Sequence, residues 1–297
     1  MDFVVRTGHL PAPGETVLGG GFQMIPGGKG ANQACAAGRL ASSTPVRMVG
    51  RVGYDMFADH LKASLAAAGV DVSAVAAVRN EPTGVALIGV DAAGQNAIIV
   101  AAGANGVFPA ADVEGSRASF RNSKYALFQL ETPLDTVAAA LRLARREGAK
   151  TILDPAPAQL LSPELLSTVD ILTPNESEAR ILLGQPAGRV TIEEAPALAK
   201  EVLALGPAAV ILKLGENGCL YADANSILHA PGFPVDVRDT TAAGDTFNAA
   251  LAVALTDELP LVEALRFANA AAALSVTRVG AQASIPARAE VESFLSL

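Results

Sequence analysis

The sequence predicts an α/β fold: a mostly parallel central sheet with helices on both faces, joined to a small β-sheet. Three observations predict it. Short apolar runs alternate with Ala- and Leu-rich stretches over most of the chain, two separated segments alternate apolar with polar residues, and 51% of the 297 residues are hydrophobic. Strand and helix in repetition imply parallel strands covered on both faces, and a chain of this length can bury a sizeable core.

The two alternating segments are residues 1–25 and 80–102. Gly84-Val-Ala-Leu-Ile-Gly-Val90 has this pattern and precedes the turn residues Asp91-Ala-Ala-Gly94. We expect the two segments to form a small antiparallel sheet, discontinuous in the sequence, that packs as a lid on one body. Residues 26–79 and 103–297 are expected to form this α/β body.

The elements of the body follow from hydrophobic periodicity and turn residues. Expected strands are 46–50, 125–129, 151–154, 169–173, 208–213 and 218–221, and expected helices are 56–69, 134–147, 193–205, 247–256, 261–277 and 287–296. Polar side chains follow several of the strands: Asp154, Asn175 with Glu178, and Lys213. Because open parallel sheets bind ligands at the carboxyl edge, we expect these residues on one rim.

Composition disfavours several functional classes. The net charge of −8 argues against nucleic acid or an anionic membrane as a partner. No apolar run reaches membrane-spanning length, and no secretory signal is recognisable. Cys35 and Cys219 lie in apolar surroundings, which favours buried thiols and a reducing cytoplasm. His9, His60 and His229 are scattered, without zinc-site spacing.

The most informative stretch is Asp239-Thr-Thr-Ala-Ala-Gly-Asp-Thr-Phe-Asn248, where a loop of small residues becomes an apolar helix. Backbone N–H groups of Ala242, Ala243 and Gly244 could approach an anion there, and the helix start adds partial positive charge. Asp245 beside them suits a base that takes a hydroxyl proton during phosphoryl transfer. Taken alone, Gly-Asp at a helix start is more often an ordinary cap.

A second glycine-rich turn, Pro26-Gly-Gly-Lys-Gly-Ala-Asn-Gln33, runs into an Ala-rich stretch that ends near Leu40. It lacks the leading glycine and the Ser or Thr of a Walker A loop, and the third glycine of a dinucleotide fingerprint. Its backbone can approach a ligand closely, and Asn32 offers a donor and an acceptor to a polar substrate. A structural turn explains the pattern equally well.

Together the two motifs resemble the paired signatures of the ribokinase-like (pfkB) carbohydrate kinases. Further segments match the family in the same order along the chain. They lie before, between and after the two motifs, at residues 13–16, 83–86, 103–105, 130–133, 154–157, 173–176 and 278–282. The resemblance implies a ribokinase-like fold, in which the body binds nucleotide and sugar. It also implies ATP-dependent phosphorylation of a small sugar, with ribose at its primary hydroxyl as the expected acceptor.

The resemblance also implies the roles of individual residues. Asp245 would be the base, and Ala242, Ala243 and Gly244 would form the anion hole. The matched sugar-binding positions are Asp2, Gly28, Lys29, Asn32, Glu131 and Asp245. The matched nucleotide-binding positions are Asn175, Lys213, Gly215, Asn217, Gly218, Gly244 and Asn269. Lys213 stands where relatives often carry Thr, and either a phosphate contact or an outward orientation would explain it.

Two metal ions are implied. Glu178 could hold a water of Mg²⁺, which prefers oxygen ligands and keeps several waters. Thr173-Pro-Asn-Glu could instead simply start a helix with Asn175 as its cap. A K⁺ ion bound mostly by carbonyls is implied beside the anion hole, at the matched positions Asp239, Thr241, Ser275, Arg278, Gly280 and Ser284.

The sequence departs from the family pattern at its beginning. Relatives open with an apolar strand and a Gly-Ser-x-Asn-x-Asp segment, of which only Asp2 is matched here. We expect the sheet to lack a central strand and the pocket to lack one sugar-binding amide. A start downstream of the true start, or a real loss, would explain the departure, and the first is favoured.

Three alternatives remain open on the sequence. A related kinase for deoxyribose or another sugar would carry the same catalytic parts. A nucleoside kinase is less favoured, because a nucleobase normally stacks on aromatic faces and this chain has 4% aromatic residues and no Trp. A sugar-binding protein without turnover is the third. The exposed edges of the lid sheet suggest a homodimer.

Overall fold

The structure, a computed structural model, describes residues 1–296. Its larger sheet has the strand order β12-β11-β10-β9-β8-β7. Four strands are parallel, and two antiparallel strands complete one edge. The parallel strands are β7 (Tyr125–Phe128), β8 (Lys150–Leu153), β9 (Ile171–Leu172) and β10 (Ala209–Lys213), and the antiparallel ones are β11 (Cys219–Asp223) and β12 (Ile227–Ala230). Leu153, Leu172 and Ile211 are buried, as expected for strands covered on both faces.

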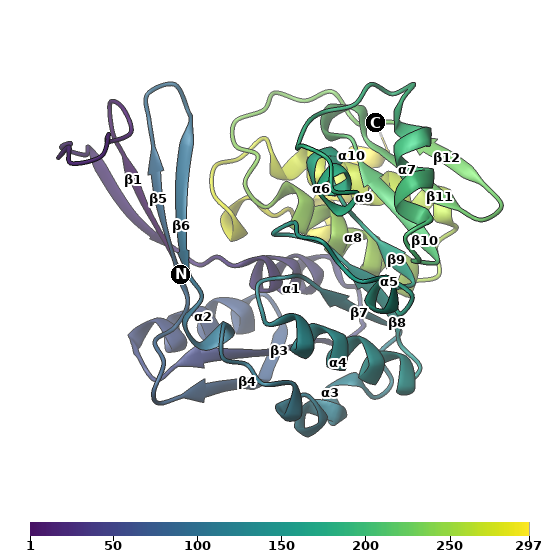
Figure 1. Cartoon of the computed structure of the whole chain (residues 1–297), viewed down its shortest axis with the longest axis horizontal. Coiled ribbons are helices and arrows are strands. Elements are labelled where there is room, and N and C mark those ends of the chain that lie inside the picture. Colours follow the sequence, from purple (N-terminus) through teal and green to yellow (C-terminus); the bar gives the residue numbers. More distant parts are fainter. Residues whose placement is uncertain (297) are drawn as a thin grey trace.

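Helices cover both faces of this sheet (Figure 1). One face packs against α4 (Leu134–Arg146), α6 (Glu176–Leu182) and α7 (Ala195–Leu203), with the short helix α5 (Pro163–Leu166) beside them. The other face packs against α1 (Lys29–Leu40), α8 (Ala243–Thr256), α9 (Leu261–Ser275) and α10 (Arg288–Leu295). Asp135 in the first turn and Arg145 and Arg146 in the last turn of α4 complement its dipole. None of the helices in the described residues is long and apolar enough to cross a membrane.

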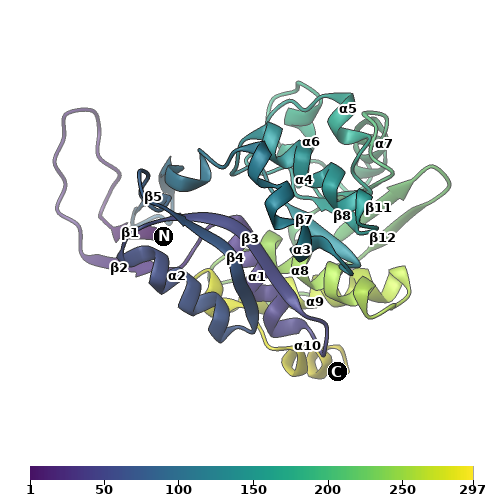
Figure 2. The same cartoon turned by 90° about the horizontal axis from the view of Figure 1, so that it is seen from below.

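A second body sheet pairs β3 (Val46–Gly53) with β4 (Val70–Val78) in parallel, connected by α2 (Met56–Ala67). Within residues 1–296 it shares no strand pairing with the larger sheet, so the expected interruption of the central sheet is present. Figure 2 shows the two sheets as separate groups of strands. A cavity of about 1010 Å³ is lined by side chains from both facing edges, including Met48 and Val52 of β3 and Leu127 and Phe128 of β7.

The lid is a four-stranded sheet of order β2-β1-β5-β6, which stands apart from the body in Figure 1. Its strands are β1 (Asp2–Arg6), β2 (Gly21–Ile25), β5 (Val85–Val90) and β6 (Asn96–Ala101). The expectation of an antiparallel lid is wrong at its centre, because β1 pairs with β5 in parallel. A turn fixes the direction of strands within each hairpin, but it does not fix how two hairpins from distant segments meet.

The lid is attached to the body through Asp55, the N-cap of α2. Its carboxylate accepts hydrogen bonds from the backbone N–H groups of Phe57 and Ala58 and from both the N–H and the hydroxyl of Thr83, just before β5. Gly53 N–H donates to the same Thr83 hydroxyl. One capping residue therefore ties the base of the lid to the end of β3.

Across the lid, strand register aligns one apolar row: Met24, Phe3, Leu87 and Ile99. Met24, Leu87 and Ile99 are 52%, 51% and 69% exposed. Residues opposite one another on adjacent strands lie on one face of a sheet. The lid therefore presents a continuous apolar face to its surroundings.

Several elements differ from the sequence expectation. β4, β12 and α5 were not expected as separate elements, and α8 begins at Ala243 rather than at 247. The remaining short helices are α3 (Arg117–Phe120) and 3-10 helices at Gly103–Asn105, Ala110–Asp112, Glu114–Ser116, Gly215–Asn217 and Gln282–Ser284. Periodicity misses β4 because its Ala- and Val-rich sequence fits both a strand and a helix.

Candidate active site

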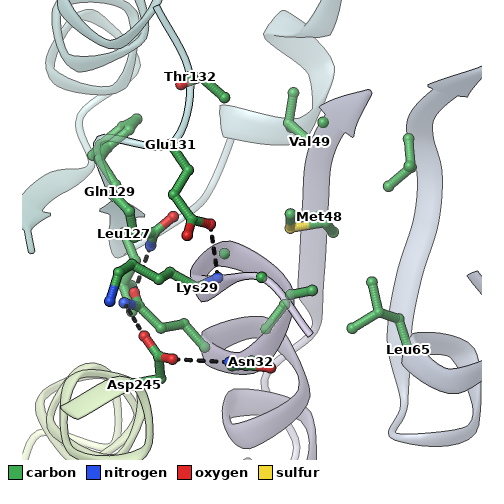
Figure 3. Close-up of a pocket in the computed structure, with 18 of the residues that line it drawn as sticks. Lys29, Asn32, Met48, Val49, Leu65, Leu127, Gln129, Glu131, Thr132 and Asp245 are labelled. Carbon is green, nitrogen blue, oxygen red and sulfur yellow. Dashed lines mark hydrogen bonds between the residues drawn. The ribbon is translucent and has the colours of Figure 1, made fainter. Parts of the chain in front are cut away.

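The site centres on Asp245, in the first turn of α8. Its side chain reaches the same cavity as α1, and two amides hold it there (Figure 3). Asn32 Nδ2 donates to Asp245 Oδ2 at 3.0 Å, and Gln33 Nε2 donates to Asp245 Oδ1 at 3.0 Å. Asp245 is buried, at 6% exposure. Both oxygens accept from neutral amides, which leaves lone pairs on each for a substrate hydroxyl.

The start of α8 has the geometry of an anion site. Ala242 has a left-handed backbone, with φ 60°, and turns the chain into the helix. Within the described residues, the N–H groups of Ala242 and Gly244 donate to no protein acceptor, whereas Ala243 N–H donates to Thr240 O at 3.2 Å. A β-carbon on Gly244 would lie 3.4 Å from Lys213 Nζ. Free amides, a helix start and an ammonium group therefore meet at one point.

The glycine-rich turn before α1 brings two carboxylates to the other side of the cavity. Lys29 N–H donates to Glu131 Oε2 at 2.9 Å. Gly28 has φ +94°, which favours glycine, and a β-carbon on Gly27 would collide with the Asp2 carboxylate. Burial is the main cause that raises the pKa of both Asp2 and Glu131. The expected sugar positions Asp2, Gly28, Lys29, Asn32, Glu131 and Asp245 all line this one cavity.

Lys213 forms a buried ion pair at the end of β10. Its Nζ donates to Asp154 Oδ1 at 2.9 Å, and the two side chains are 13% and 4% exposed. Burial alone would lower the pKa of Lys213, but the charges of Asp154 and Glu178 outweigh it and raise the pKa above its usual value. The lysine is therefore cationic at neutral pH. It points into the site and not into solvent.

Asn175 and Glu178 form a capping box at the start of α6. Glu178 N–H donates to Asn175 Oδ1 at 2.8 Å, and Asn175 N–H donates to Glu178 Oε2 at 2.7 Å. The simple explanation of this motif, a helix start with Asn175 as its cap, is therefore present. It does not exclude a ligand role, since a backbone β-bridge pairs Asn175 with Lys213, and Glu178 Oε1 accepts no hydrogen bond from residues 1–296.

The other expected nucleotide residues lie on the loop after β10 and on α9. Gly215 and Asn217 belong to the 3-10 helix there, and a β-carbon on Gly218 would collide with Ala230 O. Asn269 is buried, and its Nδ2 donates to the carbonyls of Ala230 and Pro231 at 3.0 and 3.1 Å. Asn269 therefore holds the chain after β12 against α9.

The expected cation positions divide into two groups. Asp239 joins two loops, because it accepts hydrogen bonds from Thr241 N–H and hydroxyl and from Gly280 N–H. Although burial would raise the pKa of Asp239, these hydrogen bonds lower it, so the group is anionic. The hydroxyls of Ser275 and Ser284 donate to carbonyls within their own turns, and the Arg278 guanidinium pairs with Glu290.

Sequence reasoning assigned no role to Gln33, Gln129 or Asp154 in holding Asp245. Gln33 follows Asn32 directly in the glycine-rich motif, and Gln129 lies at the end of β7. Asp154 was expected on the rim, and it accepts from Gln33 Nε2 at 3.1 Å. The signal that could have found Gln33 is its place beside Asn32 in the polar start of an otherwise apolar helix, and the signal for the other two is their position directly after a strand.

The sequence and structure are similar to those of characterised proteins. Residues 1–288 match the family described as pfkB family carbohydrate kinase. The chain is 43% identical to a ribokinase of Bacillus subtilis, over 100% of this chain and 96% of the relative. A deoxyribokinase of Salmonella typhi is 34% identical, over 100% and 96%.

Among solved structures, the ribokinase of Arabidopsis thaliana complexed with ribose and ATP aligns with a TM-score of 0.90 at 36% identity. The alignment covers 100% of this chain and 96% of that one. This likeness over the whole length confirms the expected α/β fold with its small β-sheet.

Proposed function

Because the chain belongs to the pfkB family of carbohydrate kinases, we propose that it transfers the γ-phosphoryl group of ATP to the primary hydroxyl of ribose. The observation that carries the proposal is the position of Asp245. A buried carboxylate lies at a helix start with free N–H groups, in a cavity that also contains Asp2, Asn32 and Glu131.

In the proposed reaction, Asp245 accepts the proton of the ribose hydroxyl as the oxygen attacks the γ-phosphorus, and the bond to the ADP oxygen breaks. The N–H groups of Ala242 and Gly244 stabilise charge on the transferred group, with Ala243 joining if its long bond to Thr240 opens. Asp2, Glu131 and Asn32 hold the sugar hydroxyls, with Gly28 and Lys29 shaping the wall.

For the nucleotide, we propose that Lys213 meets the phosphates and that Asn175, Gly215, Asn217, Gly218 and Asn269 form the rest of the site. Lys213 is supported by its charge and by its position against Gly244. When bound, Mg²⁺ would neutralise phosphate charge. Glu178 fits a water-mediated contact with it, because one carboxylate oxygen accepts the N–H of the helix cap and the other accepts no hydrogen bond from the described residues.

A K⁺ ion fits the loops that Asp239 joins beside the anion hole. The anionic Asp239 carboxylate draws the segments of Thr241 and Gly280 together, and carbonyls there, with those near Ser275, Arg278 and Ser284, would supply neutral oxygens. We also propose a homodimer through the apolar lid row of Met24, Leu87 and Ile99, because faces of this kind are normally covered. The buried free thiols Cys35 and Cys219 suit the reducing cytoplasm.

The proposal is tested by incubating the protein with ATP, Mg²⁺ and K⁺ and a panel of ribose, 2-deoxyribose, hexoses and nucleosides, while ADP release and the sugar product are measured. We expect ribose to give the highest kcat/KM and the product to be the 5-phosphate. A preference for 2-deoxyribose would change the assigned substrate within the same chemistry. Sugar binding without ADP release from any acceptor would contradict catalysis and favour a binding protein.

The pH dependence of this reaction follows from the environment of Asp245. Burial raises the pKa of its carboxyl; Asp154 adds to this, while Lys29 and the bonds from Asn32 and Gln33 oppose it. The base is therefore protonated at a higher pH than an ordinary aspartate, whose pKa is about 3.9. We expect kcat/KM for the sugar, measured against pH, to fall on acidification with an apparent pKa above that value. An acid limb at or below it would contradict the assignment of this buried group.

A further inference from the structure

Gln33 occupies an unusual position beside the base of the proposed reaction. Gln33 is 2% exposed and lines the same cavity as Asp245, but both N–H bonds of its side-chain amide are directed at protein groups, which leaves no donor for a substrate. Its Nε2 donates to two carboxylates at once, Asp245 Oδ1 at 3.0 Å and Asp154 Oδ2 at 3.1 Å. A buried amide that binds two carboxylates acts on those carboxylates and not on the ligand.

The orientation of this amide is fixed from its other end. Gln129 Nε2, at the end of β7, donates to Gln33 Oε1 at 2.5 Å (Figure 3 labels Gln129). Rotating the Gln33 amide by 180° would place its oxygen against two carboxylates and its NH₂ against another NH₂. The observed arrangement gives a partner to both N–H bonds and to the oxygen of the Gln33 amide, so it is strongly preferred.

The second oxygen of Asp245 is held by a similar pair of amides. Asn32 Nδ2 donates to Oδ2, and Gln282 Nε2 approaches Asn32 Oδ1 at the longer distance of 3.5 Å. Asn32, however, also belongs to the proposed sugar site. Gln33, in contrast, is not among the expected sugar positions, and both of its side-chain N–H bonds are donated to carboxylates.

We propose that Gln33 is a positioning residue of the phosphoryl transfer, which fixes the rotation of the Asp245 carboxylate and, through Asp154, joins it to Lys213 on the phosphate side. The inference rests on the proposed function, and it assigns to Gln33 an effect on the rate of that reaction. Lys213 Nζ donates to Asp154 Oδ1 while Gln33 Nε2 donates to Asp154 Oδ2. One hydrogen-bond network therefore connects the Asp245 carboxylate with the Lys213 ammonium group. Orientation of a reacting group to within about 1 Å can change a rate by about 100-fold.

The carboxylate of Asp245 faces charged groups from several elements. They are Lys29 on α1, Asp154 after β8, Asp2 on β1, Glu131 after β7 and Lys213 at the end of β10. The bond from Gln33 favours the ionised carboxylate. Losing it would raise the pKa of Asp245, and the acid limb of the pH profile would then move to higher pH.

The test is Gln33→Leu, which removes the amide and keeps a similar volume. We expect kcat to fall at least about tenfold, KM for ATP and ribose to change less than about threefold, and the acid limb to move to higher pH. Gln185→Leu is the matched control, because within the described residues the side chain of Gln185 makes a single hydrogen bond, at 3.5 Å to Glu201 and away from the site. A wild-type kcat, an unmoved acid limb, or an effect confined to KM would overturn the proposal.

Gln129→Leu keeps the proposal testable if the buried Gln33 variant fails to fold. It should lower kcat in the same direction, and in the double variant it should add almost nothing to Gln33→Leu, because it acts through Gln33. Fully additive effects of the two substitutions on kcat, or no effect of Gln129→Leu alone, would contradict the proposal that Gln129 acts through Gln33. An inactive wild-type protein would instead count against the proposed function, so the two failures are distinguishable.

Discussion

Replacing Asp245 with Asn should lower kcat by about two to four orders of magnitude, while ATP binding changes little. The amide cannot accept the proton of the sugar hydroxyl, but the N–H groups at the start of α8 remain in place. Steady-state kinetics with ribose and calorimetric titration with ATP measure the two effects. Unchanged turnover would remove Asp245 from the role of base.

The same substitution has a structural cost that must be separated from chemistry. Both Asp245 oxygens accept from amides, so one NH₂ of the new Asn would face the donor of Asn32 or Gln33. An unsatisfied buried donor costs about 1–3 kcal/mol, and the free energy of unfolding should be measured alongside. Asp135→Asn, in the first turn of α4 and exposed, is the matched control and should alter neither turnover nor nucleotide binding.

Replacing Lys213 with Met should have the largest effect on stability, lowering the free energy of unfolding by about 3–5 kcal/mol. Removing the ammonium leaves Asp154 buried and uncompensated, next to the carboxylates of Glu178 and Asp245. Chemical denaturation measures this loss. We also expect kcat/KM for ATP to fall at least about tenfold, because a cation at the anion site is lost.

The double variant Lys213→Met with Asp154→Asn separates the two effects. Neutralising both members of the pair should recover most of the lost free energy of unfolding, because no charge is left unpaired. It should not recover kcat/KM for ATP. A double variant that is both stable and fully active would show that Lys213 serves only to balance Asp154.

The sequence predicts the fold well where periodicity and turn chemistry act locally. The strands β7, β8 and β10 and the helix α4 lie close to their expected bounds. The parallel pairing of β1 with β5 depends on a contact between distant segments, which no local pattern encodes. The early start of α8 is also missed, since Ala242 at its N-cap makes no side-chain capping hydrogen bond that a sequence pattern could signal.

For the site, the resemblance placed the expected sugar positions on one cavity, and the structure brings them together. What sequence reasoning missed are the contacts behind them. Gln33 and Asp154 are separated by 121 residues and meet only in the folded chain, where the start of α1 lies within hydrogen-bond distance of the residue that follows β8. The capping box of Asn175 and Glu178 shows the opposite case, where the simple local explanation holds and leaves the ligand role as a proposal.

In the part of the chain that the structure describes, the sheet that contains β3 does not pair with the sheet that contains β7, and this affects what sets the distance between the sugar-binding Asn32 and the base Asp245. Asn32 lies on α1 and Asp245 on α8, and since no strand pairing joins the two body sheets within residues 1–296, the seam between these two helices sets the alignment of the two side chains. That seam is built from small side chains, among them Ala34, Cys35 and Ala249. A bulkier side chain there would push the two helices apart. It would thereby separate Asn32 from Asp245 without contacting either ligand.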